Sequence, residues 1–255
     1  MTETRIEAEQ EGGVLDGLLF VPEPEGPHAR GPWPLVVMYM DAFGLRPALS
    51  AMARRLTARG YAVVQPNLYW RAGAYAPFDA ATAFRDPPER ERLMKLMHGV
   101  RPEQVMADTR SLVDLVAVDD ARIRTGRFGV VGYCMGGRVA FISAERLADR
   151  VIAAACIHPG GVVTDTPESP HRDVADIRGT IYIAAADEDS SFTPEQRAIL
   201  SEALDAAHVA YELELFVGAR HGFAVPDHAV YNEDAAEEQW ERVLALFDRT
   251  VRPEV

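Results

Sequence analysis

Short, strongly apolar segments alternate with amphipathic helical patterns over most of this chain, and that alternation limits the fold more than any other feature. Segments that are apolar throughout are typical of strands buried on both faces, and their alternation with helices is typical of parallel sheets. The candidate strands are Pro34–Met40, Tyr61–Gln65, Phe128–Cys134, Val151–Ile157, Ile181–Ala186 and Tyr211–Val217. The sequence therefore predicts an α/β fold in which a mostly parallel central sheet carries helices on both faces.

Other local patterns add detail to this fold. Two alternating stretches, around Ile6–Glu9 and Leu15–Val21, predict an antiparallel hairpin at a sheet edge, and the Pro/Gly-rich residues 22–33 predict a loop. Thr193-Pro194-Glu195-Gln196 has the form of a capping box, so we expect a helix from there to about His208. Apolar residues at helical spacing predict further helices within 49–56, 105–116 and 240–247.

The length and organisation of the chain favour one domain. A chain of 255 residues can bury the core of a single α/β domain, and no internal repeat or linker divides it. We therefore expect a single domain over residues 1–255. Residues 71–100 form an unusually long connection, which is interpreted as a partial cover over a functional site, with an edge decoration as an equal alternative.

Charge and targeting signals restrict the partners. The chain has 26 Lys and Arg against 39 Asp and Glu, a formal charge of −13, and no basic block, so nucleic acid is not an expected partner. A small molecule is favoured instead. A neutral one is slightly preferred, because an anionic substrate would have to be met by a few placed arginines rather than by the overall field. We expect no leader peptide and no membrane span, hence a cytoplasmic protein in which Cys134 and Cys156 stay reduced.

The segment Gly132-Tyr133-Cys134-Met135-Gly136-Gly137 lies between an apolar strand pattern and a helical pattern, which is the context of a nucleophile elbow. A sharp strand-to-helix turn strains the central residue, and neighbouring glycines avoid collisions. Cys134 would then lie at a helix N-terminus, where the helix dipole favours a thiolate and backbone N–H groups can bind an oxyanion.

Two alternatives compete with a nucleophilic Cys134. A phosphate loop is disfavoured because cysteine occupies the place of the middle glycine of GxGxxG and no GK[ST] follows. A buried structural cysteine is the usual fate of a free thiol. We accept that interpretation for Cys156 and prefer the nucleophile for Cys134.

A thiol nucleophile needs a general base, and His221 follows the last candidate strand, where a loop can return to the elbow. His158 and His171 also lie beyond a strand and could border the pocket, although ordinary packing is the preferred interpretation for both. The carboxylate that orients the base is Asp187 or Asp189, after the preceding strand. We favour Asp189, three residues past Ala186.

The oxyanion donors are expected from two backbone amides. The amide of Met135 follows the nucleophile, and that of Ala42 lies in the turn after the strand Pro34–Met40. Asp41 in the same turn is a good helix-capping residue type.

With these segments in hand, the chain resembles the dienelactone hydrolase family of α/β-hydrolases over nearly its whole length. The resemblance rests on GYCMGG, on the carboxylate after the following strand and on RHGF, and also on VVMYMDAFGLRP and PNLYWR. It implies an α/β-hydrolase fold and a carboxylic ester hydrolase with dienelactone hydrolase (carboxymethylenebutenolidase) chemistry. A Cys134–His221–Asp189 triad would open an enol-lactone through a thioester, without a metal or organic cofactor.

The resemblance also implies secondary roles. Asp41 stands where a Glu is usual and would be an auxiliary acid for the thiolate. The family's characterised lactonase binds a substrate carboxylate with arginines, one of them shortly after the triad histidine, and no arginine follows His221 closely. Arg90 could match the other arginine, with Arg71, in the loop after a strand, as the alternative. Tyr69, Trp70 and Phe223 are candidates for an apolar acyl pocket, with plain core as the alternative.

Two other functions remain open from the sequence. The same chemistry could serve unrelated acyl substrates, as in an esterase or thioesterase. A hydrolase fold with an inactive site could also act as a binding protein. The sequence makes no prediction about the oligomeric state.

Overall fold

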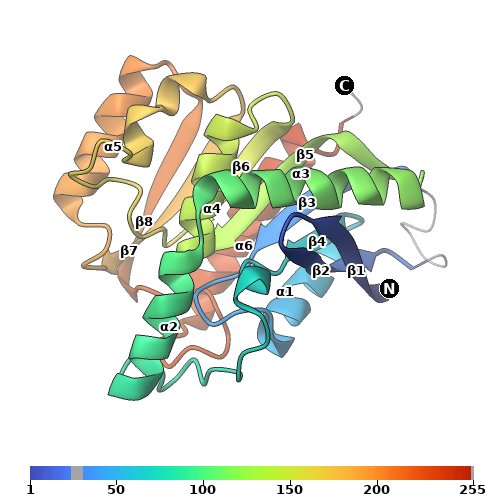
Figure 1. Ribbon diagram of the computed structural model, residues 1–255. Coiled ribbons are helices and arrows are strands. Elements are labelled where there is room, and N and C mark those ends of the chain that lie inside the picture. The colour runs from blue at the N-terminus through green and yellow to red at the C-terminus, as the bar shows by residue number, and fades with distance from the viewer. Residues whose placement is uncertain (24–30, 254–255) are drawn as a thin grey trace. The chain divides into compact units, whose positions relative to one another are not determined.

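The computed structural model describes residues 1–23 and 31–253 (Figure 1). Most of the loop predicted for residues 22–33 lies outside the described residues. The chain divides into two compact units, Met1–Phe128 and Gly129–Val255, and the division falls within strand β5 (Ile123–Tyr133). Among the described residues, no helix combines the length and the apolar character that a membrane crossing requires.

The first unit contains a mixed sheet in the strand order β1-β2-β4-β3. Its strands are β1 (Thr2–Gln10), β2 (Gly13–Val21), β3 (Trp33–Tyr39) and β4 (Ala62–Pro66). The β1–β2 and β2–β4 pairs are antiparallel and the β3–β4 pair is parallel. The predicted hairpin at a sheet edge is therefore confirmed. Every residue of β3 and β4 is buried, in agreement with sequences that are apolar except for Gln65.

Helices α1 (Pro47–Thr57), α2 (Pro87–Gly99) and α3 (Pro102–Asp119) complete the first unit, with a short 3₁₀ turn, η1 (Trp70–Ala72). Each of the three α-helices begins with proline, whose missing N–H and fixed φ suit the first turn. The predicted stripe of α1 is buried and contacts β2 and β4, and α3 contacts β1 and β4.

The second unit contains the strand order β5-β6-β7-β8. After β5 come β6 (Val151–Ile157), β7 (Thr180–Glu188) and β8 (Tyr211–Arg220), and the β6–β7 and β7–β8 pairs are parallel. The helices are α4 (Met135–Arg146), α5 (Pro194–Ala206) and α6 (Glu233–Thr250), with short 3₁₀ turns η2 (Pro170–Arg172) and η3 (Val174–Asp176). Helix α4 packs on β6, and α6 packs on β6 and β7 (Figure 1). The strand–helix alternation predicted from the sequence is confirmed.

The start of α5 shows how local sequence sets an element boundary. The Thr193 hydroxyl accepts the N–H of Gln196, and the Gln196 side chain accepts the N–H of Thr193 at 2.8 Å. This reciprocal pair is the predicted capping box. It ends the loop that follows β7 and so limits where the side chains of that loop can lie.

The second unit brings four polar residues to one edge of its sheet. Cys134, His158, Asp189 and His221 are each the first residue after a strand, namely β5, β6, β7 and β8. Parallel strands end at the same edge of a sheet, where ligand and catalytic sites of such folds form. The amide of Cys134 also donates to the carbonyl of Ile157 at 3.0 Å, which sets the ends of β5 and β6 side by side.

Candidate active site

Cys134 lies at a strained turn between β5 and α4. Its φ of 56° and ψ of −117° fall in a region that residues other than glycine rarely adopt, at a cost of roughly 1–3 kcal/mol. The turn is so tight that a Cβ at Gly132 would lie 1.9 Å from the carbonyl oxygen of Gly136. Only glycine fits there, so this sequence produces the elbow and leaves the half-buried Cys134 at the N-terminus of α4.

The structure brings His221 and Asp189 together across the ends of β8 and β7. The imidazole Nδ1–H donates to Asp189 Oδ2 at 2.7 Å, and the Asp189 side chain is only 1% exposed. The other candidate acid, Asp187, is exposed and its Oδ2 accepts the N–H of Gly218 at 3.2 Å. Of the two carboxylates, Asp189 therefore has the geometry that fixes a histidine tautomer.

The electrostatics of the site favour a charged imidazole beside the thiol. Burial acts to lower the pKa of His221, but attraction to Cys134 and the hydrogen bonds with Asp189 and Cys134 outweigh it and raise this pKa to about 10. Burial acts to raise the pKa of Asp189, but the hydrogen bonds from His221 and Ser191 hold it below its usual value. Such an arrangement can stabilise a thiolate–imidazolium pair.

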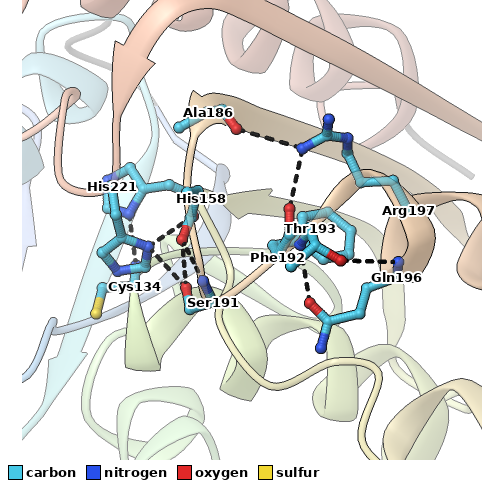
Figure 2. Close-up of polar contacts among 10 residues, drawn as sticks. Cys134, His158, Ala186, Ser191, Phe192, Thr193, Gln196, Arg197 and His221 are labelled. Atoms are coloured by element: carbon cyan, nitrogen blue, oxygen red, sulfur yellow. Dashed lines mark hydrogen bonds and ion pairs between the residues drawn. The ribbon is translucent and has the colours of Figure 1, made fainter.

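Ser191 is a member of the site that the sequence analysis missed. Its hydroxyl donates to Asp189 Oδ1 at 2.6 Å and lies 3.1 Å from His221 Nδ1, and its backbone N–H donates to the same Oδ1 at 2.8 Å. Figure 2 shows Ser191 beside the two ring systems of the site. An Asp followed two residues later by Ser is a common turn pattern, so the Asp189-Ser190-Ser191 sequence carried a signal for this contact.

His158, for which packing was the preferred interpretation, lies against the reactive residues. Its side chain is fully buried, its Nδ1 accepts the N–H of Cys134 at 3.1 Å, and its ring centroid is 5.0 Å from that of His221 (Figure 2). Phe223, a predicted pocket residue, is also fully buried, with its ring 5.5 Å from that of His158. His171 instead lies 2.7 Å from the Ser169 hydroxyl.

Arg138 contributes a cation near this edge that was not anticipated. It lies one turn beyond Cys134 on α4, beside Gly161 of the loop that follows β6: a Cβ added to Gly161 would lie 3.8 Å from Nη1 of Arg138. A Cβ added to the preceding Gly160 would lie 3.8 Å from Cε1 of His221, so this loop passes both side chains. Its Nε is buried and has no hydrogen-bond partner among the described residues. Burial lowers the pKa of Arg138 from its usual value.

Glu145, further along α4, interacts electrostatically with Arg138 and acts to raise its pKa. Burial, with a further contribution from Asp173, raises the pKa of Glu145 to about 9, so this carboxyl is neutral at pH 7. The remaining cysteine, Cys156, is fully buried, and burial raises the pKa of its thiol. Both cysteines are free thiols, as expected.

The first unit holds the other predicted residues. Asp41 is fully buried, forms a bidentate ion pair with Arg46 at 2.7 and 2.8 Å, and accepts the N–H of Phe43. The carbonyl of Ala42 accepts the hydroxyl of Tyr69 at 2.7 Å. These contacts give the turn after β3 a defined shape.

Trp70 and Arg90 are the remaining predicted residues of the first unit. The indole N–H of Trp70 donates to Asp108 at 2.9 Å, and the Arg71 guanidinium covers its ring. Arg90 is exposed on α2.

The segment 71–100 packs against the turn after β3. Phe78, Ala83 and Leu93 from the segment form one apolar cluster with Ala42 and Phe43. A cavity of about 350 Å³ lies between the same parts of the first unit. Its lining residues are Arg5, Asp16, Leu18, Phe43, Leu45, Arg46, Asn67, Tyr75, Pro77 and Phe78.

Similarity to known proteins extends over nearly the whole chain. The model of the dienelactone hydrolase family matches residues 15–251. The carboxymethylenebutenolidase of Pseudomonas sp. (strain P51) is 27% identical over 222 residues, which cover 87% of each chain. A Synechocystis sp. protein, provisionally assigned as a carboxymethylenebutenolidase, is 25% identical over 232 residues, covering 89% of this chain and 90% of that protein.

Solved structures show the same fold. A Klebsiella pneumoniae protein, provisionally assigned as a dienelactone hydrolase, has a TM-score of 0.81 at 24% identity and covers 98% of this chain and 100% of that chain. The dienelactone hydrolase-like promiscuous phosphotriesterase P91, from metagenomic libraries, has a TM-score of 0.73 at 18% identity, with 97% and 98% covered. The predicted α/β-hydrolase fold is confirmed.

Fold and family match together define this protein as a hydrolase of the α/β-hydrolase class. More particularly, the chain belongs to the dienelactone hydrolase family, as its elbow and histidine segments had indicated.

Proposed function

We propose that this hydrolase cleaves a small ester or enol-lactone through Cys134, His221 and Asp189, with a thioester acyl-enzyme intermediate. The observation that carries the proposal is the chain of contacts from Asp189 through His221 to Cys134, with the cysteine on a strained turn at a helix N-terminus. A nucleophile, a base and an orienting carboxylate in this order are the parts that covalent ester hydrolysis requires.

The reaction has two halves. The Cys134 thiolate attacks the ester carbonyl carbon, and the amides of Met135 and Ala42 donate hydrogen bonds to the resulting oxyanion. Collapse of this intermediate forms the thioester and expels the alkoxide or enolate, which takes a proton from the His221 imidazolium. His221 then removes a proton from a water molecule, which attacks the thioester and releases the carboxylic acid and the thiolate.

Charge at the site supports a substrate with an anionic group, such as the carboxylate of a carboxymethylenebutenolide. Arg138 lies beside Gly161 in the loop that follows β6, and its buried Nε has no hydrogen-bond partner among the described residues. A guanidinium that is partly removed from water binds a carboxylate more strongly than an exposed one such as Arg90. We therefore assign the carboxylate contact to Arg138 in addition to the sequence-based candidate Arg90.

The turn after β3 supports a second set of roles. The bidentate pairing of Asp41 with Arg46 favours a role in shaping the turn that presents the Ala42 amide, and its action as an auxiliary acid stays a prediction. The apolar cluster joins residues 71–100 to the turn after β3, which supports this segment as a partial cover. A single domain over residues 1–255 stays a prediction. Tyr69 and Phe223 remain candidates for the acyl pocket, whereas the contacts of Trp70 favour core packing.

A cytoplasmic location fits this chemistry. The mechanism requires a reduced Cys134, and the cytosol keeps thiols reduced. The expected partner is a small-molecule ester or lactone substrate.

The replacement of Cys134 by Ala tests the proposed function. We expect the variant to fold and to lose hydrolysis of 4-nitrophenyl acetate, while Cys156→Ala, a change at the buried thiol, retains it. Turnover by Cys134→Ala at the wild-type rate would refute the assignment of Cys134 as the nucleophile. A panel of carboxylate-bearing lactones and linear esters separates a lactonase from a general esterase or thioesterase, and the absence of turnover on every member would favour a binding protein.

A further inference from the structure

The loop after β6 places a second histidine against both reactive groups. His158 is the first residue after β6, as Cys134, Asp189 and His221 are the first residues after β5, β7 and β8. Its side chain is fully buried, which is unusual for an imidazole without a structural or chemical reason. Neither half of the proposed reaction gives His158 a role.

The contact between His158 and the elbow involves the backbone of the nucleophile. The N–H of Cys134 donates to His158 Nδ1 at 3.1 Å as well as to the carbonyl of Ile157 at 3.0 Å. An imidazole nitrogen accepts a hydrogen bond only when it carries no proton, so this contact needs the ring nitrogen Nδ1 unprotonated. A residue with a φ of 56° needs surrounding contacts to hold it, and this hydrogen bond is one of them.

The ring of His158 also contacts the base. It meets the His221 ring edge to face, with centroids 5.0 Å apart and an interplanar angle of 63°, and on another side it packs against Phe223. The backbone of His158 has a φ of 35°, a positive value that is uncommon outside glycine, although histidine, asparagine and aspartate adopt it more often than other residues do. A strained residue in contact with two reactive groups is a pattern of functional sites.

We propose that His158 is a positioning residue: it accepts the N–H of Cys134 to hold the strained elbow, and its ring supports the imidazole of His221. It acts through these two residues and does not contact the reacting bond. The inference rests on the proposed function for its role in turnover. Its effect on the reactivity of the Cys134 thiol does not depend on any substrate.

Two substitutions separate the hydrogen bond from the backbone strain. His158→Gly removes the acceptor but suits the positive φ, whereas His158→Asn also tolerates that φ and provides Oδ1 where Nδ1 lies. We expect His158→Gly to lower kcat and the rate of Cys134 alkylation by iodoacetamide by about tenfold, with KM within about twofold. His158→Asn should recover both rates only in part, to about threefold below the wild type, because the acceptor returns while the ring that packs against His221 does not.

The controls distinguish positioning from folding. His171→Asn makes the same change at a histidine that contacts Ser169, and it should leave both rates unchanged. Thermal unfolding and circular dichroism report whether each variant is folded. Mass spectrometry assigns the alkylated residue, and the buried Cys156 is expected to stay unmodified.

Two results would overturn the inference. One is a folded His158→Gly variant with wild-type kcat and alkylation rate, and the other is a His158→Asn variant as impaired as His158→Gly. Failure of the proposed function looks different. In that case Cys134→Ala would keep full hydrolytic activity, while the order of alkylation rates among the His158 variants would be unaffected.

Discussion

The replacement of Asp189 by Asn isolates the effect of the carboxylate charge on His221. The Asp189 side chain is 1% exposed and 2.7 Å from Nδ1 of His221, and Asn has nearly the same size, so the change removes charge without opening a cavity. A hydrogen bond to a charged group contributes roughly 1.5–3 kcal/mol. That energy alone corresponds to about 10- to 150-fold in rate.

A wrong tautomer adds to this loss. The Asn amide can donate an N–H to Nδ1 of His221, which leaves the ring proton on Nε2, the nitrogen available to Cys134. His221 could then no longer accept the thiol proton. The equivalent change in a Ser–His–Asp triad lowers kcat by about 10⁴-fold, and we expect a loss of roughly 10³- to 10⁴-fold here, with a smaller change in KM.

Stopped-flow measurement of 4-nitrophenol release reports acylation directly, and iodoacetamide alkylation reports the thiolate without turnover. Asp187→Asn is the matched control, because the Asp187 carboxylate is exposed and accepts the backbone N–H of Gly218 rather than a proton of His221. We expect this control to stay within about twofold of the wild type, as is usual for surface changes. An Asp189→Asn enzyme that acylates within about threefold of the wild type, with unchanged thermal unfolding, would refute the assignment of the acid.

Three further outcomes follow from the geometry. Gly132→Ala should prevent stable folding of the elbow, measured by thermal unfolding, because its Cβ would lie 1.9 Å from the Gly136 carbonyl oxygen. In the wild type, the raised pKa of Glu145 lowers the free energy of unfolding by an amount that is zero below pH 4.5 and grows by ~1.4 kcal/mol per pH unit up to about pH 9. Glu145→Gln should remove this loss, so urea unfolding at pH 8 should give a higher free energy of unfolding for the variant. Arg138→Gln should raise KM by about tenfold for a carboxylate-bearing lactone and far less for a neutral ester; equal effects on both would contradict a carboxylate contact.

The sign of the Glu145 effect follows from proton binding. The pKa of this carboxyl is raised to about 9 in the folded protein, so between pH 4.5 and 9 the unfolded chain is ionised while the folded chain still holds the proton. Stability therefore falls as the pH rises through that window. A variant whose stability has the same pH dependence as the wild type would show that Glu145 is not the group responsible.

Much of the fold could be predicted because its signals are local. The strands β3 and β6 are apolar throughout and β4 is apolar except for Gln65, and such sequences predict strands that are buried on both faces. The capping box at Thr193 lies within four residues and formed as expected. Element boundaries are less accurate: β5 begins at Ile123, five residues before the apolar run that predicts it, because residues 123–127 contain a single apolar side chain, Ile123, and so give no apolar run.

Among the candidate site residues, those that belong to a local sequence motif could be predicted from the sequence. Those that are candidates only because of tertiary contacts could not. Gly132 marks the elbow because the turn itself excludes a side chain at that position. No sequence pattern marks Arg138. It becomes a candidate only because the folded chain packs its guanidinium beside Gly161, with no hydrogen-bond partner for Nε among the described residues. Its position one turn after Cys134 also does not distinguish it from an ordinary arginine on a helix.

What the chain order alone determines is which residue types stand at the strand ends: a cysteine between glycines, a histidine after β8 and a pair of aspartates at the end of β7. Only the folded structure shows which of those aspartates contacts His221. The β7–β8 pairing is irregular between Ala186 and Glu188, and there Asp187 binds the backbone of Gly218 while Asp189 reaches His221. Turns and periodic patterns arise from neighbouring residues, whereas the direction of a side chain beyond a bulge depends on the partner strand, which no local pattern records.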